Sequence, residues 1–326
     1  MSLAGVVAAV AVGLSLLGEG EVTVPAPLQP GDKVMILSPA SGADPAVIDD
    51  AIVRLQADGY RAVAAPNAYC HHGTFGGTDA ERFSDLRQAI LDPEVKAIIC
   101  SRGGYGAVHI LEALDTLPIA ENPKWLVGFS DISALHALWN KHGVASIHGP
   151  MCAPIGREHR GHDVDTLMHL LAGAALDYSF DAHPLNRAGS VRAPLVGGNL
   201  AVLDALASTP FDIVGWGNVL FIEDVAEPVY KIERQLYRLK LSGALANLSG
   251  LIVGHFTDYS PDADFSSMER MIADMVAEYD FPVAFGIPVG HASPNMPLVE
   301  GVEVQFDVAP DGSVKIYQNP YHAAAP

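Results

Sequence analysis

Three side chains that together could hydrolyse an amide or an ester each follow a short apolar run: Ser130, Glu223 and His291. A serine hydroxyl becomes a strong nucleophile when a general base takes its proton. A histidine can be that base when a carboxylate fixes its tautomer and stabilises the imidazolium. Because apolar runs of this length are typical of buried strands, we expect all three side chains at strand ends. The residue types and their positions therefore predict a serine hydrolase.

The stretch around Ser130 has the pattern of a strand, a tight turn and a helix. Trp125 to Val127 is a short apolar run, and apolar residues recur at helical spacing from Ile132 onward. A hydroxyl on the turn between them projects beyond the strand end, as in a nucleophile elbow. The match to G-x-S-x-G is partial, because position 132 is Ile. On this stretch alone, capping of the helix by Ser130 or Asp131 is the stronger interpretation, and the rest of the chain favours the nucleophile.

Two backbone N–H groups near Ser130 could stabilise the negative charge that develops during acyl transfer. One belongs to Asp131, which directly follows the serine, and the other could come from the Gly103-Gly104 turn after the preceding strand. Glycine suits such a turn because its backbone can approach a ligand closely. The competing interpretation is a phosphate-binding glycine loop. The sequence does not support it, because neither G-x-x-x-x-G-K-[ST] nor a G-x-G-x-x-G after the first strand occurs.

Other polar residues leave alternatives open. Asp224, beside Glu223, could equally be the carboxylate partner of the histidine. The pairs His71-His72 and His159/His162 are metal ligands by type, but neither has a third ligand at a characteristic spacing. We interpret them as surface residues, and expect neither a metal nor any other cofactor.

Composition restricts the class of protein. The chain has 326 residues, enough for two domains, with 49% hydrophobic and 17% charged residues, as in globular proteins. A formal charge of −19 argues against nucleic acid or an anionic membrane surface as a partner. Three cysteines, Cys70, Cys100 and Cys152, are odd in number and unsuited to a disulfide framework. They fit a reducing compartment, so we expect a cytoplasmic protein.

One apolar segment, Ala4 to Leu17, precedes the globular part. Its length is that of the hydrophobic region of a signal peptide, but no basic residue precedes it and no clear cleavage site directly follows. We interpret residues 1–26 as a non-catalytic extension. An exported form is the alternative if residues 4–17 are the remnant of a signal. No stretch has the roughly 18 apolar residues of a membrane span.

The remaining chain predicts an α/β protein of two domains. From residue 34 to residue 148, apolar strands alternate with amphipathic helices through short connections, which predicts a parallel, doubly wound sheet. In such sheets ligands bind at the carboxyl ends of the strands. We expect a nucleophile domain at 27–176, a polar linker at 177–189 and a mixed, β-rich domain at 190–326. Residues 302–308 and 314–317 predict a hairpin at the end of the second domain.

Five motifs occur in the order in which they are found in the LD-carboxypeptidase family of serine peptidases. The chain resembles that family from about residue 27 to its C-terminus, including the opening Leu28–Val34 and Ser38–Ser41. The five ordered motifs are far more specific together than any one alone. They are Ser101–Gly106, Gly128–Asp131, Val196–Leu200, Phe221–Asp224 and Gly286–His291.

The resemblance implies a role for each of the candidate residues. Ser130, Glu223 and His291 would form the triad, and the N–H groups of Gly104 and Asp131 would form the oxyanion hole. It also implies a flavodoxin-like N-terminal domain, a smaller β-rich C-terminal domain, a site at their junction and a homodimer.

Members of the family divide into two substrate types. Muramoyl-tetrapeptide carboxypeptidases cleave the L,D-amide before the terminal D-alanine of murein peptides, in peptidoglycan recycling. Microcin C immunity proteins hydrolyse the amide that joins an aminoacyl group to a nucleotide analogue, and tend to carry a longer insertion between Ser and Glu. The interval from Ser130 to Glu223 holds no extra aromatic-bearing loop, so we expect the carboxypeptidase type, with a murein peptide as substrate.

Three residues of one turn are candidates for substrate binding: Arg102, Gly103 and Tyr105. The forked guanidinium of Arg102 is suited to the substrate's terminal carboxylate, although it could as easily brace the turn. Two other classes stay open. An α/β-hydrolase esterase orders its triad in the same way, but would need Gly at position 132 and no mixed second half. A non-enzymatic ligand-binding module would leave Ser130 unreactive.

Overall fold

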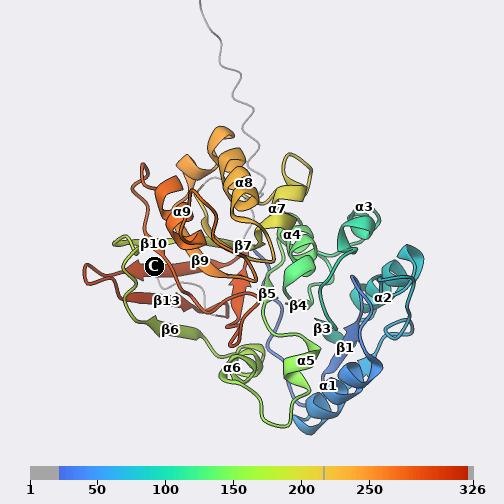
Figure 1. Ribbon diagram of the computed structural model, residues 1–326. Coiled ribbons are helices and arrows are strands. Elements are labelled where there is room, and N and C mark those ends of the chain that lie inside the picture. The colour runs from blue at the N-terminus through green and yellow to red at the C-terminus, as the bar shows by residue number, and fades with distance from the viewer. Residues whose placement is uncertain (1–21, 216, 322–326) are drawn as a thin grey trace, which may run out of the picture.

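The computed structural model describes residues 22–215 and 217–321. The apolar segment Ala4 to Leu17, which we interpret as an extension, lies outside these residues. Two β-sheets organise the described chain, and each belongs mainly to one half of the sequence. Figure 1 shows the blue-to-green half, with helices α1 to α5, beside the yellow-to-red half, with helices α7 to α9.

The first sheet has six strands in the order β11-β5-β4-β3-β1-β2. Strands β1 to β5 are parallel, and their order is that of flavodoxin-like folds. The sixth strand, β11, comes from the second half of the chain and pairs antiparallel with β5. The strands are β1 (Lys33–Leu37), β2 (Arg61–Ala64), β3 (Val95–Cys100), β4 (Trp125–Gly128), β5 (Ser146–His148) and β11 (Leu298–Glu300).

The helices of this half connect its parallel strands. Their sequences contain strong start signals: Asp44 caps α1 through the Ala46 N–H, and Thr78 and Glu81 form a capping box at the start of α2. The helices are α1 (Pro45–Ala57), α2 (Asp79–Leu91), α3 (Leu111–Leu114), α4 (Ser133–Lys141), α5 (Cys152–Ile155) and α6 (His162–Leu171), with short 3₁₀ turns η1 (Ala107–Ile110) and η2 (Ser130–Ile132).

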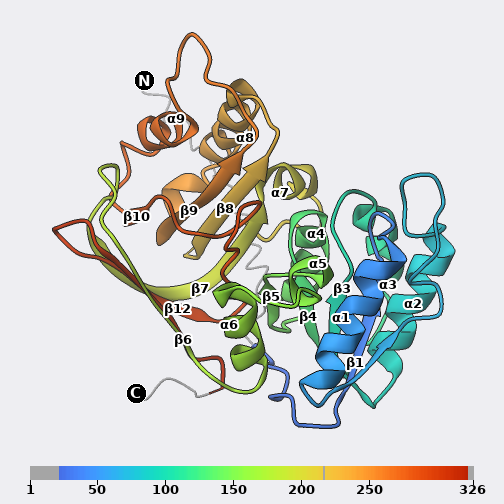
Figure 2. The same ribbon diagram turned by 60° about the horizontal axis from the view of Figure 1, so that its bottom comes forward.

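The second sheet has seven strands in the order β10-β9-β8-β7-β12-β13-β6. Strands β7 to β10 are parallel, whereas β12, β13 and β6 are antiparallel additions (Figure 2). The strands are β6 (Leu176–Phe180), β7 (Gly189–Asn199), β8 (Val219–Val225), β9 (Gly250–Thr257), β10 (Val283–Ala284), β12 (Glu303–Val308) and β13 (Val314–Gln318). Its helices are α7 (Leu200–Leu206), α8 (Val229–Leu241), α9 (Met268–Met275) and the 3₁₀ turn η3 (Leu245–Asn247).

This architecture confirms the predicted fold class, a flavodoxin-like parallel sheet followed by a mixed, β-rich half. Four details differ from the expectation. His291, which we expected at a strand end, lies on the loop that follows β10. The predicted linker at 177–189 begins as an edge strand, because residues 176–180 are β6. Strand β11 crosses to the first sheet, and helix α9 was not predicted. The exact division into 27–176 and 190–326 stays a prediction.

Within residues 22–215 and 217–321, no helix combines the length and the hydrophobicity that crossing a membrane takes.

The two sheets meet where β7 approaches the first half of the chain. The Ser133 Oγ, at the start of α4, accepts a hydrogen bond from the Asn199 N–H at 3.0 Å. The fully buried carboxyl of Glu300, on β11, accepts one from the Gly197 N–H at 3.4 Å. These contacts fix the carboxyl end of β7 against the strands that carry the first half of the candidate site.

Strand β7 can lie this close to β8 because residue 197 has no side chain. A Cβ on Gly197 would lie 2.0 Å from the Phe221 carbonyl oxygen, a backbone atom that cannot turn away. We expect Gly197→Ala to lower the free energy of unfolding by about 1–3 kcal/mol, the usual cost of overpacking. Denaturant unfolding of both proteins measures this difference.

Gly215→Ala is the matched control, since its Cβ would meet no atom nearer than 3.6 Å. We expect it to change the free energy of unfolding by no more than about 0.5 kcal/mol. Equal effects of the two substitutions would contradict the packing of β7 on β8.

Candidate active site

Ser130 stands on a strained turn between β4 and α4. Its φ is +67°, in the left-handed region that residues other than glycine seldom adopt. Strain of this kind costs of order 1–3 kcal/mol and is typical of functional sites. The turn accepts Ile132 because Gly128 has no side chain: a Cβ there would lie 2.9 Å from the Ile132 Cγ2. The turn thus achieves an elbow without the second glycine of G-x-S-x-G.

The capping interpretation of this turn is not what the structure contains. Neither η2 nor α4 has a side-chain cap. The Asp131 carboxylate instead accepts a hydrogen bond from the Ala107 N–H at 2.8 Å, on a different segment. Ser130 is therefore free to interact with other groups.

Ser130, His291 and Glu223 form a continuous chain of hydrogen bonds. The His291 Nε2 lies 3.0 Å from the Ser130 Oγ, and its Nδ1 lies 2.6 Å from the Glu223 Oε2. A carboxylate only accepts hydrogen bonds, so the histidine Nδ1–H donates to Glu223. In this tautomer the Nε2 lone pair faces the serine hydroxyl, as a general base requires.

Glu223 reaches His291 from strand β8, and two glycines make room for it. A Cβ on Gly290 would lie 2.6 Å from the Glu223 Oε2, and a Cβ on Gly254 would lie 3.3 Å from its Cβ. The Glu223 side chain is fully buried. Its neighbour Asp224 points the other way, as strand alternation requires. There it accepts hydrogen bonds from the Asn199 Nδ2 and the Ala201 N–H.

The loop that carries His291 is held by two buried residues that the sequence did not single out. The Asn295 Oδ1 accepts a hydrogen bond from the Gly290 N–H at 2.8 Å, and the Asn295 N–H donates to Asp163 at 2.9 Å. The His291 ring also packs edge-on against Phe129, with 5.0 Å between ring centroids. The two hydrogen bonds hold the loop, and Phe129 supports the ring itself. No local pattern marks Asp163 or Asn295, because they are far apart in the sequence.

The charge of Glu223 sets the protonation of His291. Burial lowers the pKa of His291, but the hydrogen bond and the negative charge of Glu223, together with the charges of Asp224 and Asp258, outweigh burial, and the pKa is raised. Burial has the opposite sign for a carboxyl, and it raises the pKa of Asp224 to about 6 against three hydrogen bonds. Glu223 is therefore the carboxylate that stabilises an imidazolium at His291.

The turn after β3 lies directly against the nucleophile candidate. A Cβ on Gly103 would lie 2.7 Å from the Ser130 Cβ and 2.9 Å from its Oγ. Gly104 has a φ of +104°. Within the described part of the chain, neither the Gly104 N–H nor the Asp131 N–H has a hydrogen-bond acceptor. Both amides are thus available to an oxyanion beside Ser130.

Arg102 and Tyr105 lie on the exposed side of the same turn. The Arg102 side chain is exposed, and its Nη1 makes a long contact, 3.5 Å, with the Gly42 carbonyl. Tyr105 is 54% exposed, and its hydroxyl lies 3.2 Å from the His109 Nε2. Neither side chain contacts Ser130, His291 or Glu223. If Arg102 or Tyr105 binds a ligand, it therefore does so beside the triad and not as part of it.

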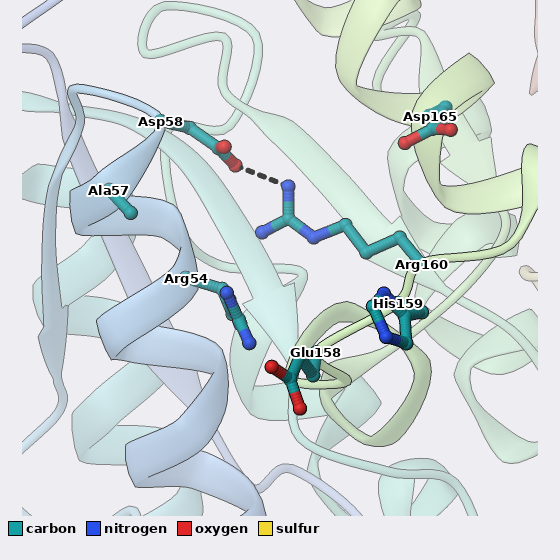
Figure 3. Close-up of a pocket in the computed structure, with 7 residues that line it drawn as sticks. All are labelled: Arg54, Ala57, Asp58, Glu158, His159, Arg160 and Asp165. Atoms are coloured by element: carbon teal, nitrogen blue, oxygen red, sulfur yellow. Dashed lines mark hydrogen bonds and ion pairs between the residues drawn. The ribbon is translucent and has the colours of Figure 1, made fainter.

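The histidine pairs do not form a metal centre. Among residues 22–215 and 217–321, no group of three or more His, Cys, Asp or Glu side chains is arranged to hold a metal ion. His159 lines a surface pocket with Arg54 and Arg160, and Arg160 pairs there with Asp58 (Figure 3). This pocket shares no residue with the Ser130 site.

We expect Glu223→Gln to lower the pKa of His291 markedly, because the amide keeps the shape of the side chain but removes the charge that raises it. Asp224→Asn should lower that pKa much less, since Asp224 faces away from the ring. An NMR titration of the His291 ring measures both shifts. Equal shifts in the two variants, or the larger one in Asp224→Asn, would contradict this assignment of the carboxylate.

Two family models match the chain: the LD-carboxypeptidase N-terminal domain at residues 34–149 and the LD-carboxypeptidase C-terminal domain at residues 192–306. A probable murein peptide carboxypeptidase of Bacillus subtilis is 33% identical, over 87% of this chain and 92% of the relative. The murein tetrapeptide carboxypeptidase of Pseudomonas aeruginosa is 31% identical, over 82% of this chain and 91% of the relative.

Solved structures agree with these matches. A muramoyltetrapeptide carboxypeptidase from Oxalobacter formigenes superposes with a TM-score of 0.80 at 27% identity, over 87% of this chain and 98% of the other. A microcin C7 self immunity protein in complex with aspartyl sulfamoyl adenosine has a TM-score of 0.81, over 92% of this chain and 100% of the other. Its identity is 22%, so that likeness shows the fold alone. With both domain models matched and relatives above 30% identity along nearly the whole fold, the chain belongs to the LD-carboxypeptidase family of serine-type enzymes.

Proposed function

We propose that this enzyme hydrolyses the L,D-amide bond before the terminal D-alanine of murein tetrapeptides. The observation that carries the proposal is the hydrogen-bonded chain Ser130–His291–Glu223, in a protein with two relatives that are named murein carboxypeptidases. Such a chain is the machinery of acyl transfer by an activated serine.

In the first half of the reaction, the Ser130 Oγ attacks the scissile carbonyl while the His291 Nε2 takes the hydroxyl proton. Glu223, 2.6 Å from the Nδ1, stabilises the imidazolium that forms. The carbonyl oxygen becomes an oxyanion, and the N–H groups of Gly104 and Asp131 donate to it. The intermediate collapses when His291 returns the proton to the leaving amine. D-alanine departs, and the remaining peptide is left as an ester on Ser130.

In the second half, water attacks the ester carbonyl. His291 takes a proton from the water and later returns it to the Ser130 oxygen, which restores the free enzyme. The same two amides stabilise the second oxyanion. No group besides these residues and water is required, so the proposed mechanism involves neither a metal nor any other cofactor.

Substrate choice would depend on the free carboxylate of the terminal D-alanine. Arg102 is an exposed guanidinium two residues from Gly104, and its Nη1 approaches the Gly42 carbonyl at 3.5 Å. A guanidinium can bind a carboxylate with two parallel hydrogen bonds. We assign it that role, with Gly103 and Tyr105 as the neighbouring contacts to the substrate backbone.

A second candidate substrate is an aminoacyl sulfamoyl nucleotide. The likeness in fold to the immunity protein with bound aspartyl sulfamoyl adenosine favours it. The murein peptide is the better supported of the two, because two relatives above 30% identity are named as murein peptide and murein tetrapeptide carboxypeptidases. A cytoplasmic location, which the cysteine content favours, and a homodimer, which the resemblance implies, belong to the same proposal.

Ser130→Ala is expected to lower kcat by about 10⁴-fold or more, because the triad acts as a unit. The relevant assay is release of D-alanine from a murein tetrapeptide, with circular dichroism and a melting curve to establish that the variant folds. Alanine at a φ of +67° is no less compatible with the turn than serine. Near-normal turnover by a folded Ser130→Ala protein would exclude serine catalysis.

Amidation of the substrate's C-terminus is expected to remove most of kcat/KM, since it abolishes the charge that Arg102 would bind. Arg102→Ala should bring the two substrates to similar, low values. Arg61→Ala is the control, as Arg61 is an exposed arginine on β2 that pairs with Glu94. Amino-acid release from tetrapeptide, amidated tetrapeptide and an aminoacyl sulfamoyl adenosine should be compared side by side. Cleavage of the adenosine compound alone would replace the murein proposal with the second candidate.

A further inference from the structure

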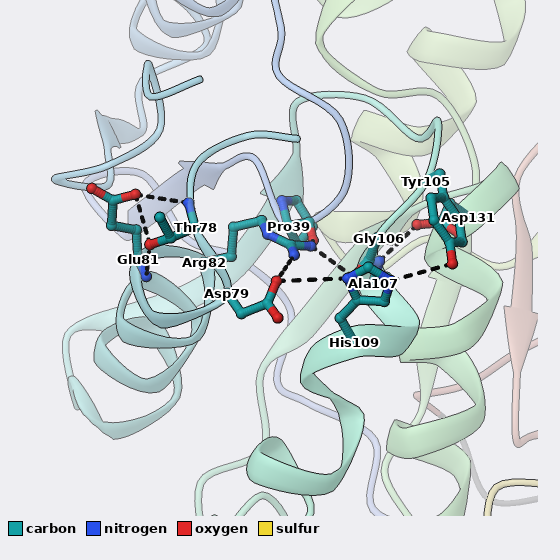
Figure 4. Close-up of polar contacts among 10 residues, drawn as sticks. All are labelled: Pro39, Thr78, Asp79, Glu81, Arg82, Tyr105, Gly106, Ala107, His109 and Asp131. Carbon is teal, nitrogen blue, oxygen red and sulfur yellow. Dashed lines mark hydrogen bonds and ion pairs between the residues drawn. The ribbon is translucent and has the colours of Figure 1, made fainter. Parts of the chain in front are cut away.

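One peptide group, between Gly106 and Ala107, is held at both ends by side chains of opposite charge. Its carbonyl accepts a hydrogen bond from the Arg82 Nη1 at 2.6 Å. Its N–H donates to the Asp131 carboxylate at 2.8 Å. Figure 4 shows Arg82 on one side of this peptide and Asp131 on the other. Bonds to charged groups are roughly twice as strong as neutral ones, so the peptide plane is firmly oriented.

Arg82 is itself fixed in place. It stands on α2, its side chain is fully buried, and its Nη1 also donates to the Pro39 carbonyl at 2.8 Å. Its Nη2 pairs with Asp79, and its guanidinium lies 5.1 Å from the centre of the Phe75 ring. A buried charge without such partners would be strongly destabilising, so the guanidinium has one position. That position is defined by the loops after β1 and β3.

Asp131 connects the same peptide to the nucleophile. It directly follows Ser130, and only 5% of it is exposed. Burial raises the pKa of Asp131, against the opposing effects of the Ala107 N–H and the positive charge of Arg82. Because its backbone is part of the Ser130 turn, its carboxylate joins that turn to the segment that begins η1.

We call the two side chains that hold this peptide, Arg82 and Asp131, the clamp. The peptide lies two residues beyond Gly104. Gly106 has a φ of +126°, and a Cβ there would lie 2.7 Å from the Arg82 Nη1, so only glycine lets the guanidinium approach. On its other side the turn is tied to Ser41, whose N–H donates to the Gly103 carbonyl and whose Oγ accepts from the Tyr105 N–H. With both ends of the turn fixed, the direction of the Gly104 N–H is fixed too.

We propose that Arg82 and the Asp131 side chain are a pair of positioning residues that aim the Gly104 amide at the oxyanion next to Ser130. This inference rests on the proposed function, because an oxyanion forms beside Ser130 only if the enzyme carries out acyl transfer there. A misplacement of about 1 Å can cost roughly 10²-fold in rate, and loss of one oxyanion donor costs about 10²–10³-fold. The clamp therefore acts on kcat, whereas substrate affinity in the ground state changes little.

The experiment compares kcat and KM for Arg82→Lys, Asp131→Asn, Asp131→Ala and the double variant Arg82→Lys/Asp131→Ala. Lysine keeps the charge but cannot reproduce the fork of bonds. We expect Arg82→Lys and Asp131→Ala each to lower kcat about 10- to 100-fold, with KM within about threefold. Asp131→Asn keeps an acceptor and should lose less than Asp131→Ala. The double variant should be no worse than the poorer single one, since both act on one peptide.

Arg160→Lys is the matched control. Arg160 also bridges a backbone carbonyl and an aspartate, with its Nε 3.1 Å from the Ile155 carbonyl and its Nη1 2.6 Å from Asp58, but at the separate pocket of Figure 3. We expect its kcat to equal that of the wild type. A melting curve for each variant establishes that the fold is retained under assay conditions.

Two further readouts separate failure of the clamp from failure of the proposed function. Modification of Ser130 by a fluorophosphonate depends on the oxyanion hole but requires no peptide substrate. Its rate should therefore fall among the variants in the same order as kcat. If the wild type reacts with the phosphonate but not with the tetrapeptide, the substrate proposal fails and these rates still test the clamp. The crystal structure of Arg82→Lys should have a reoriented Gly106–Ala107 peptide. The inference would be overturned if the folded variants had the same kcat and the same phosphonylation rate as the wild type. It would also be overturned if the Gly106–Ala107 peptide kept its orientation in the crystal structure of Arg82→Lys.

Discussion

The hydrogen bond between the Ser130 Oγ and the His291 Nε2 joins the two halves of the molecule. The serine comes from the first sheet, whereas the histidine and Glu223 come from the part of the chain that builds the second. A 3.0 Å contact between such parts persists only if the sheets keep a fixed relation. Strand β11 helps to provide it, because it runs in the first sheet while its Glu300 binds the backbone of β7. The Ser133–Asn199 bond adds a second connection one helical turn from Ser130.

Much of the site depends on glycines, which have no side chain and so let other groups come close. Gly103 lets the turn after β3 contact Ser130, Gly290 leaves space for the Glu223 carboxylate, and Gly128 accommodates Ile132. A methyl group at any of these positions would meet an atom at under 3 Å. Because the backbone comes this close, the groups available to an oxyanion beside Ser130 are backbone amides and not mobile side chains. Amides held in this way need no reorganisation when charge develops.

The fold class was predictable because it follows from local patterns, whereas the choice of Glu223 over Asp224 in the triad followed from the resemblance to the family. Short apolar runs predicted most of the strands, but the run from Ile287 to Val289, just before His291, is a loop beyond β10. Strand β11 was not predictable in this way, because three residues with an antiparallel partner far away in the sequence have no local signature. Strand β6 was taken for a linker because, at the sheet edge, it buries only Leu176 and Tyr178. Arg82, Asp163 and Asn295 were missed since a buried polar residue is recognised only by its partners.

The most direct test of the account is to isolate the covalent intermediate. A murein tetrapeptide whose terminal D-alanine is replaced by D-lactate has an ester in place of the scissile amide, so acylation should outpace deacylation. Rapid quenching followed by mass spectrometry of the digested protein would then find the tripeptide acyl group on the peptide that contains Ser130, and none in His291→Ala. Hydrolysis of this ester with no adduct, or with the adduct on another residue, would contradict the central role of the Ser130–His291 bond.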